Sequence, residues 1–237
     1  MALPMLEMLP LAQARHILDV GAGTGELFED LRRRAPHAHI MGVDRSEGML
    51  RVAQARGVAR LAVMDAQRLA LADAAFHVAV CIFVLFHLPN PLEALRELRR
   101  VLRAGGEIGA VTWGDDPGAP GAAIWRAALD AAGAAPDPRD PSIMQHRRMD
   151  TEAKLDALLR EAGFTGLRTQ HRRAEHRFTV ESLLTVQLRC GVASRRLPSL
   201  ATGEQARCRA QVEERLRRLS PEELVYRPEV IFAVARR

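Results

Sequence analysis

The sequence predicts an α/β fold with a mostly parallel sheet, because three strand-to-helix units follow one another within its first 65 residues. Short apolar runs over 16–20, 39–44 and 58–65 mark the strands of these units. A fourth run over 76–88 is almost continuously apolar, which is typical of a central strand covered on both faces. Right-handed crossovers bring the carboxyl ends of such strands to one edge of the sheet, where we expect the chemistry.

Residues 16–26, with the sequence HILDVGAGTGE, predict a buried strand, a tight turn and a helix. Glycine at alternate positions permits positive φ angles and lets a ligand lie against bare backbone, at Gly21, Gly23 and Gly25. A nucleotide-hydrolysing phosphate loop needs a lysine after its last glycine, and Glu26 stands there instead. A dinucleotide fingerprint needs glycine or alanine at the same position. These observations leave a nucleoside ligand without phosphates.

Capping residues and glycines predict the boundaries of the elements that follow. Ser46 is expected to cap a helix that ends at Gly57, and Asn90 to cap a helix that Gly105 and Gly106 stop. A loop-rich connection around a short helix over 123–133 is expected over 114–149. The remaining predicted elements are strands over 107–113, 164–178 and 228–237, a helix over 150–163 and two helical stretches within 179–219.

The motif order from residue 16 to about residue 113 resembles that of the class I S-adenosylmethionine-dependent methyltransferases. Residues 16–26 resemble the first motif of the family. Residues 72–111 resemble its methyltransferase domain 11 branch, which carries small-molecule and ubiquinone-type enzymes. The resemblance implies a Rossmann-like, seven-stranded, mostly parallel sheet with helices on both faces and an antiparallel last strand between the fifth and the sixth. It also implies a cofactor-binding core over 1–178 and 220–237, and a helical lid inserted over 179–219.

The resemblance implies S-adenosylmethionine as the cofactor and assigns two acids to its adenosine part. Asp44 would accept hydrogen bonds from both ribose hydroxyls, since a carboxylate offers two acceptor oxygens. The alternative for Asp44 is a charge at the N-terminus of the next helix. Asp65 and the backbone amide of Ala66 would recognise the edge of adenine, and a turn cap is the alternative for Asp65.

Other residues would surround the methionyl part of the cofactor. Asp19 would brace the glycine turn or attract the ammonium group, and the turn itself would contact the cofactor through the backbone of Gly21, Gly23 and Gly25. Cys81, Ile82 and Phe83 are expected to border the sulfonium, although Phe83 is equally compatible with a place in the core. Cys81 is disfavoured as a nucleophile, because no proline precedes it and no base is evident near it in the sequence.

An acceptor hydroxyl of high pKa needs a general base, and histidine is the usual side chain for that role. His87 follows the fourth strand and His146 lies in the loop-rich connection, so both are candidates, with a structural role as the alternative for each. His77 stands where the family typically begins its fourth strand with aspartate. No HExxH motif, paired cysteines or acid cluster indicates a metal site.

The composition bears on partners and on compartment. The sequence isoelectric point of about 10 is compatible with nucleic-acid binding, but of the 34 basic residues only Lys154 is a lysine, and alanine is abundant. This bias indicates GC-rich coding, so nucleic acid is disfavoured as a partner and an RNA methyltransferase is kept only as an alternative. Three cysteines, and the lack of an apolar run of 18 residues, predict a reduced, cytoplasmic protein without a membrane span.

The resulting hypothesis is methyl transfer to a small-molecule acceptor, with oxygen as the expected acceptor atom, in bacterial secondary metabolism. The further alternative is a protein that keeps the fold and the cofactor pocket but does not methylate. About 15 residues precede the first strand, fewer than the family usually carries. We therefore expect the pocket to be more open on that side, or covered by residues 179–219 or by the second subunit of a homodimer.

Overall fold

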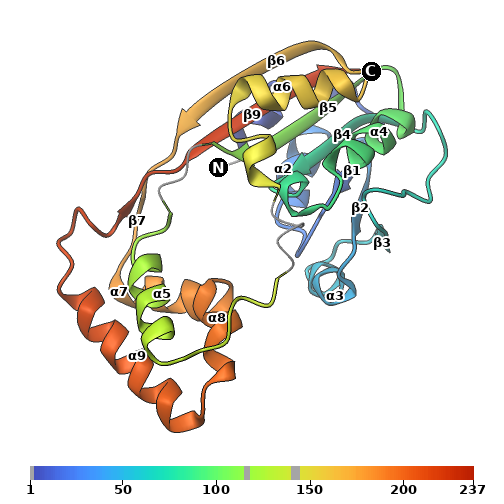
Figure 1. The fold of residues 1–237 in the computed structure, drawn as a ribbon. Helices are drawn as coiled ribbons and strands as arrows, with labels where there is room; N and C mark the ends of the chain where they lie inside the picture. The colour runs from blue at the N-terminus through green and yellow to red at the C-terminus, as the bar shows by residue number, and fades with distance from the viewer. Residues whose placement is uncertain (1–2, 115–117, 140–144) are drawn as a thin grey trace. The chain divides into compact units, whose positions relative to one another are not determined.

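The computed structural model describes residues 3–114, 118–139 and 145–237, and the chain divides into two compact units (Figure 1). The first, named the sheet unit, comprises Met1–Asp115, Ser142–Arg172 and Glu229–Arg237. The second, named the helical unit, comprises Asp116–Pro141 and Arg173–Pro228. Every residue that the sequence predicts for the site belongs to the sheet unit.

The sheet unit is built on seven strands: β1 (His16–Val20), β2 (His39–Asp44), β3 (Leu61–Val63), β4 (Phe76–Ile82), β5 (Leu102–Trp113), β6 (Thr165–Arg173) and β9 (Glu229–Arg236). They form one sheet in the order β3-β2-β1-β4-β5-β9-β6. The pairs from β3 to β5 are parallel, and β9 runs antiparallel to β5. The predicted class, the number of strands and the antiparallel last strand between the fifth and the sixth are therefore confirmed.

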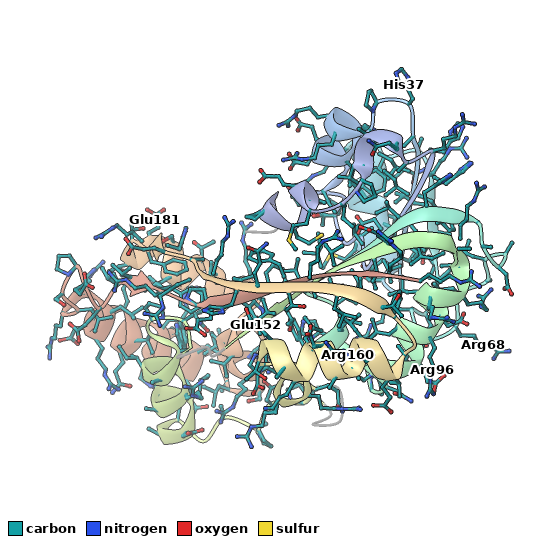
Figure 2. The ribbon with its side chains drawn as sticks, turned by 90° about the horizontal axis from the view of Figure 1, so that it is seen from above. His37, Arg68, Arg96, Glu152, Arg160 and Glu181 are labelled. Carbon is teal, nitrogen blue, oxygen red and sulfur yellow. The ribbon has the colours of Figure 1, made fainter. Side chains whose placement is uncertain are left out.

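One face of the sheet is covered by α4 (Pro91–Val101) and α6 (Glu152–Glu161). Their buried leucines share one apolar core with Leu18 of β1 and with residues of the other strands that lie on the same face of the sheet. Arg96 and Arg160 are the exposed side chains labelled on these two helices in Figure 2. The helices are amphipathic because apolar residues recur every three or four positions, which places them all on the side that meets the sheet.

The opposite face is covered by α1 (Leu3–Glu7) and α2 (Phe28–Arg34). Glycines in the strands allow close approach there. A Cβ atom on Gly109 would lie 2.2 Å from the sulfur of Met5, and one on Gly42 would lie 2.9 Å from the ring of Phe28. Helices on both faces of the sheet were predicted, and this prediction is confirmed.

Side-chain caps begin three of the helices, and two of these caps, Ser46 and Asn90, were predicted. The side chain of Ser46 accepts a hydrogen bond from the Met49 amide at the start of α3 (Glu47–Ala55), and the side chain of Asn90 accepts one from the Glu93 amide at the start of α4. The Thr151 side chain caps α6 in the same way. Each oxygen satisfies an amide that has no partner within its helix, which explains why the sequence locates these starts well.

The junction between α4 and β5 differs from the prediction. The helix ends at Val101 and the strand begins at Leu102, whereas the sequence predicted that Gly105 and Gly106 stop the helix before a strand over 107–113. The two glycines serve an irregular start of β5 instead. Gly105 has a φ of 75°, and a Cβ atom on Gly106 would lie 3.0 Å from the carbonyl oxygen of His77.

Two predicted strands are shorter in the structure. The third covers only Leu61–Val63 of the predicted 58–65. The apolar run over 76–88 forms β4 as far as Ile82 and then a 3-10 turn, η2 (Leu85–His87). Phe83 ends the strand because its φ of 55° is incompatible with extended backbone.

The helical unit contains α5 (Ala122–Ala131), α7 (Val180–Arg189), α8 (Val192–Arg196), α9 (Thr202–Arg217) and a two-stranded sheet of β7 (His176–Arg177) and β8 (Val225–Tyr226). Trp125, Leu183 and Val212 are fully buried in a core of its own. The unit is larger than the predicted insertion over 179–219, because residues 116–141 contribute α5 and the predicted sixth strand divides into β6 and β7. A role as a lid stays a prediction.

No helix in the described part of the chain has both the length and the apolar character that crossing a membrane requires.

Candidate functional site

A cavity of about 400 Å³ lies at the carboxyl ends of β1, β2, β3 and β4. This is the edge at which the sequence predicted the chemistry, and parallel α/β sheets bind ligands there because loops from successive strands meet at it. The predicted site residues that line the cavity are Gly21, Asp44, Asp65, Ala66, Phe83 and His87. Residues that the prediction did not include also line it, among them Arg45, Met64 and Val84.

The glycine turn after β1 uses its three glycines for different purposes. All have positive φ, at 73°, 54° and 79° for Gly21, Gly23 and Gly25. A Cβ atom on Gly21 would lie 2.1 Å from a methyl of Val84, and one on Gly25 would lie 2.9 Å from a methyl of Val58. A Cβ atom on Gly23 would have the carbonyl oxygen of Gly21, 4.0 Å away, as its nearest neighbour. Packing therefore requires the first and third glycines, and the open space is at the middle one.

Asp44 ties this turn to the helix that follows β2. One carboxylate oxygen accepts a hydrogen bond from the Gly23 amide at 2.9 Å, and the other accepts one from the Ser46 amide at 2.8 Å. A carboxylate has about four lone-pair sites, so Asp44 retains acceptor capacity toward the cavity that it lines. Asp44 is thus positioned by backbone amides, and its contact with a ribose stays a prediction.

Asp65 follows β3 and also makes local backbone contacts. Its carboxylate accepts a hydrogen bond from the Gln67 amide at 2.9 Å, which is the turn-cap geometry given as its alternative. The side chain is exposed and lines the cavity next to buried Ala66. The two interpretations are compatible, because one oxygen caps the turn and the carboxylate still has free acceptor sites.

Asp19 and Cys81 lie behind the cavity rather than in its wall. Asp19 is 3% exposed, and burial together with the negative charge of Asp44 raises the pKa of its carboxyl to about 7. Burial also raises the pKa of the Cys81 thiol to about 12, with the charge of Asp19 as the second cause. Cys81 is fully buried in the core, and Ile82 and Phe83 border the cavity. A thiol with this pKa is a poor nucleophile near neutral pH, as the sequence led us to expect.

Phe83 has the most unusual backbone of the residues that line the cavity. A φ of 55° is rare for a bulky side chain, and strain of this kind concentrates at functional sites. Its amide donates to the Val111 carbonyl at 2.9 Å, and its ring stacks on Trp113 with centroids 4.3 Å apart. Both alternatives for Phe83 are partly met, because the ring is half-buried and also lines the cavity. Trp113, at the end of β5, was missed by the sequence analysis.

His87 and His146 come from different segments that meet at Phe86. His87 lies on η2 and lines the cavity, whereas His146 lies on the 3-10 turn η4 (His146–Arg148). The Phe86 ring centroid is 4.3 Å from that of His87 and 6.2 Å from that of His146. The Gln145 amide donates to the Phe86 carbonyl at 2.9 Å, which joins the two segments.

One ring nitrogen of His146 is left without a hydrogen bond by the described residues. Its Nε2 atom is buried and has no hydrogen-bond partner among the described residues. An unpartnered imidazole nitrogen can accept a proton from a hydroxyl placed beside it. His87 borders the cavity, and His146 lies in the same neighbourhood through its contact with Phe86.

His77, which stands where the family places an aspartate, lies at the opposite end of β4. It takes no part in the cavity. Over residues 3–114, 118–139 and 145–237, no group of three or more His, Cys, Asp or Glu side chains is arranged to hold a metal ion.

The chain is similar to known methyltransferases. The family of methyltransferase domains matches residues 18–109. Malonyl-[acyl-carrier protein] O-methyltransferase from Geobacter sulfurreducens is 38% identical over 152 residues, which are 62% of this chain and 55% of that protein. The chain spans about half the length of the curated relatives it matches.

Solved structures show the same fold over the whole chain. The YcgJ protein from Bacillus subtilis has a TM-score of 0.60 at 19% identity and covers 100% of this chain and 99% of its own. Phosphoethanolamine N-methyltransferase 2 from Haemonchus contortus, in complex with phosphomonomethylethanolamine and S-adenosylhomocysteine, has a TM-score of 0.58 at 17% identity, over 98% of this chain and 51% of its own. At these identities the likeness establishes the fold alone.

Proposed function

We propose that the cavity binds S-adenosylmethionine and that the protein methylates an oxygen of a small molecule, because residues 18–109 match the family of methyltransferase domains and a similar protein is named an O-methyltransferase. The observation that supports the proposal most is the meeting of Gly21, Asp44 and Asp65 around one cavity. These residues come from three successive strand ends, and the motif order had assigned all of them to one ligand.

The chemistry of the cavity suits a nucleoside with a positive charge and no phosphate. Asp44 and Asp65 line it and Asp19 lies behind it, whereas Arg45 is the arginine in its wall. Carboxylates accept hydrogen bonds from ribose hydroxyls and from the adenine amine, and they attract an ammonium group. The open space at Gly23 admits a ligand against the backbone. The residues present therefore fit S-adenosylmethionine.

When bound, S-adenosylmethionine supplies an electrophilic methyl group. In the proposed reaction Phe83 and Val84 exclude water from the apolar part of the cavity, which favours a displacement in which charge is lost. His87 or His146, whose rings both lie beside that of Phe86, accepts the proton of the acceptor hydroxyl. The acceptor atom is proposed as oxygen because a matching relative is named an O-methyltransferase.

The setting that we propose is bacterial secondary metabolism in the cytoplasm. It rests on the arginine and alanine bias of the sequence, on its likeness to small-molecule methyltransferases and on its three cysteines, Cys81, Cys190 and Cys208, which are free in the structure. A homodimer is proposed as one way to cover the cavity.

Calorimetric titration with S-adenosylmethionine tests the cofactor assignment. Asp44→Ala should weaken binding by about 1.5 to 3 kcal/mol, because the ribose loses a charged acceptor. Asp44→Asn keeps one acceptor oxygen for the backbone amides and should lose part of that amount. Glu29→Gln, on the exposed surface of α2, is the matched control and should bind like the wild type. An affinity for S-adenosylmethionine that is unchanged in Asp44→Ala would contradict the assignment of the cofactor to this cavity.

Incubation with cofactor labelled in the methyl group tests the reaction. Label in a small molecule supports the proposal, and label in RNA favours the alternative activity. Binding without transfer to any acceptor class offered indicates a protein that keeps the cavity but does not methylate.

A further inference from the structure

Three histidines stand side by side at the amino ends of the strands whose carboxyl ends form the cavity. His16 of β1 is the register partner of His39 of β2, and the β1–β4 register places His77 beside His16. The ring centroids are 5.4 Å apart for His16 and His39 and 5.7 Å apart for His16 and His77, and both pairs are stacked. We name these three side chains the imidazole row.

The hydrogen bonds of His77 leave two donors facing each other. The His16 amide donates to Nδ1 of His77 at 3.2 Å, so a neutral His77 carries its proton on Nε2. The Nη1 atom of Arg103 lies 3.2 Å from this Nε2. A guanidinium has only donors and does not lose its proton, so neither group can accept from the other. The contact lacks an acceptor.

The charged groups that act on His16 and His77 are all basic. His16 is affected by Arg103, His39, Arg60 and Arg15, and burial together with these cations lowers its pKa. Burial, Arg103, His16 and Arg15 likewise lower the pKa of His77. Among the described groups that act on these two rings, none is a carboxylate.

Two arginines of the neighbouring helix α4 are paired with acids. On α4, Arg96 binds Glu93 and Arg100 binds Glu97. Arg103 follows the same helix but faces His77 instead. Cationic and donor groups thus gather at the amino ends of β1, β2 and β4, without the carboxylates that neutralise arginines along α4. We call this region the amino edge of the sheet. His37, which precedes β2, is exposed near this edge (Figure 2).

There is also room for a ligand at this point. A cavity of about 280 Å³ is lined by His77, Arg103, Gln13 and the glycines at the start of β5. A Cβ atom on Gly105 would meet nothing within 4 Å, so the backbone there is open. Arg103 is exposed and can turn toward an anion without disturbing the core.

We propose that this amino edge is a second ligand site, which binds the phosphate group of a small anion between Arg103 and the Nε2–H of His77. A phosphate oxygen accepts from both donors at once and supplies the acceptor that their contact lacks. Arg15 and Arg60 contribute attraction over longer range. The site is independent of the proposed methyl transfer, because it uses other residues at the other ends of the strands.

Titration of the full chain with inorganic phosphate at pH 7 and constant ionic strength, set with chloride, tests the proposal. Imidazole nitrogen resonances of His16 and His77 should shift with one saturable curve, and calorimetry should give the same dissociation constant. Arg103→Gln should raise that constant about tenfold or more, because a charge-assisted hydrogen bond is lost. Arg96→Gln, at an exposed position of α4, should leave the dissociation constant unchanged. A parallel titration with glycerol 3-phosphate distinguishes a phosphate ester from the free ion as the preferred ligand.

Two outcomes would overturn the proposal. One is the absence of saturable phosphate and phosphate-ester binding by the wild type, including the case in which only an RNA oligomer binds. The other is equal binding by wild type and Arg103→Gln. Affinity of Arg103→Gln for S-adenosylmethionine should match that of the wild type, which shows that the variant is folded and separates failure here from failure of the proposed function.

Discussion

The two ends of β1, β2 and β4 differ sharply in chemistry although they belong to the same three strands. At the carboxyl ends lie the glycine turn, Asp44 and the strained backbone of Phe83, around a cavity with carboxylates. At the amino ends lie the imidazole row and arginines, without carboxylates among the described groups that act on His16 and His77. A parallel sheet keeps its two edges a strand length apart, so opposite charges can serve different ligands in one small unit.

The largest predicted effect separates the edges by packing. Gly21 and Gly105 have nearly the same φ, 73° and 75°, but only a Cβ atom on Gly21 would overlap a neighbour, at 2.1 Å from Val84. Gly21→Ala should lower the free energy of unfolding by about 2 to 5 kcal/mol, from strain plus overpacking. Gly105→Ala should cost about 1 kcal/mol, from the backbone conformation alone. Urea unfolding measures both, and equal losses would contradict the account.

The next effect concerns rate. If a histidine at the carboxyl edge is the base, His87→Gln or His146→Gln should lower kcat about 100-fold and leave cofactor affinity intact. His39→Gln at the amino edge is the matched control and should leave kcat unchanged. Steady-state kinetics with an acceptor that takes up label measures this. Wild-type rates in both of the first two variants would remove histidine as the base.

A rise in pH should change the free energy of unfolding in opposite directions through groups at the two edges, and Asp19 gives the larger effect. Its pKa is about 7 in the folded chain and 3.8 in its ordinary state, so between these values the folded state holds a proton that the unfolded state has lost. Stability from this group is therefore lost as pH rises from about 4 to 7, by at most about 1.4 kcal/mol per pH unit. Asp19→Asn should remove this slope. Urea unfolding of wild type and variant between pH 5 and 8 checks the sign, and a constant difference would contradict it.

The smallest predicted effect is the counterpart at the amino edge. The pKa of His16 and of His77 is lowered below 6.5, so on acidification the unfolded chain takes up protons before the folded chain does. Stability from these groups is present above pH 6.5 and is lost as pH falls through it. His77→Gln should make the loss below pH 6.5 shallower, as measured by urea unfolding at pH 5 to 7. If the pH dependence of the free energy of unfolding is the same in this variant as in the wild type, folding does not disfavour protonation of the imidazole row.

The sequence was a good guide where local chemistry decides the outcome. The bounds of β1 and β2 follow directly from apolar runs with polar flanks, and the predicted caps Ser46 and Asn90 begin their helices through short-range hydrogen bonds. Six predicted site residues line the cavity because each lies at or just after the end of a strand, which an apolar run locates.

Features that depend on register or on tertiary contacts could not be predicted in this way. The imidazole row joins residues 16, 39 and 77, which become neighbours only through strand pairing. Phe83 adopts a positive φ that its residue type disfavours, and its stacking on Trp113 needs the parallel register of β4 and β5. Gly105 and Gly106 looked like a helix stop, because the irregular pairing that they serve leaves no local signal.

One titration tests the central claim most directly: backbone and imidazole resonances of the wild type followed during addition of S-adenosylmethionine. The account predicts one saturable site, with shifts concentrated at Gly21, Gly23, Asp44, Asp65 and Ala66 and with His16, His39 and His77 unmoved. Absence of binding, or shifts centred on the imidazole row, would contradict it.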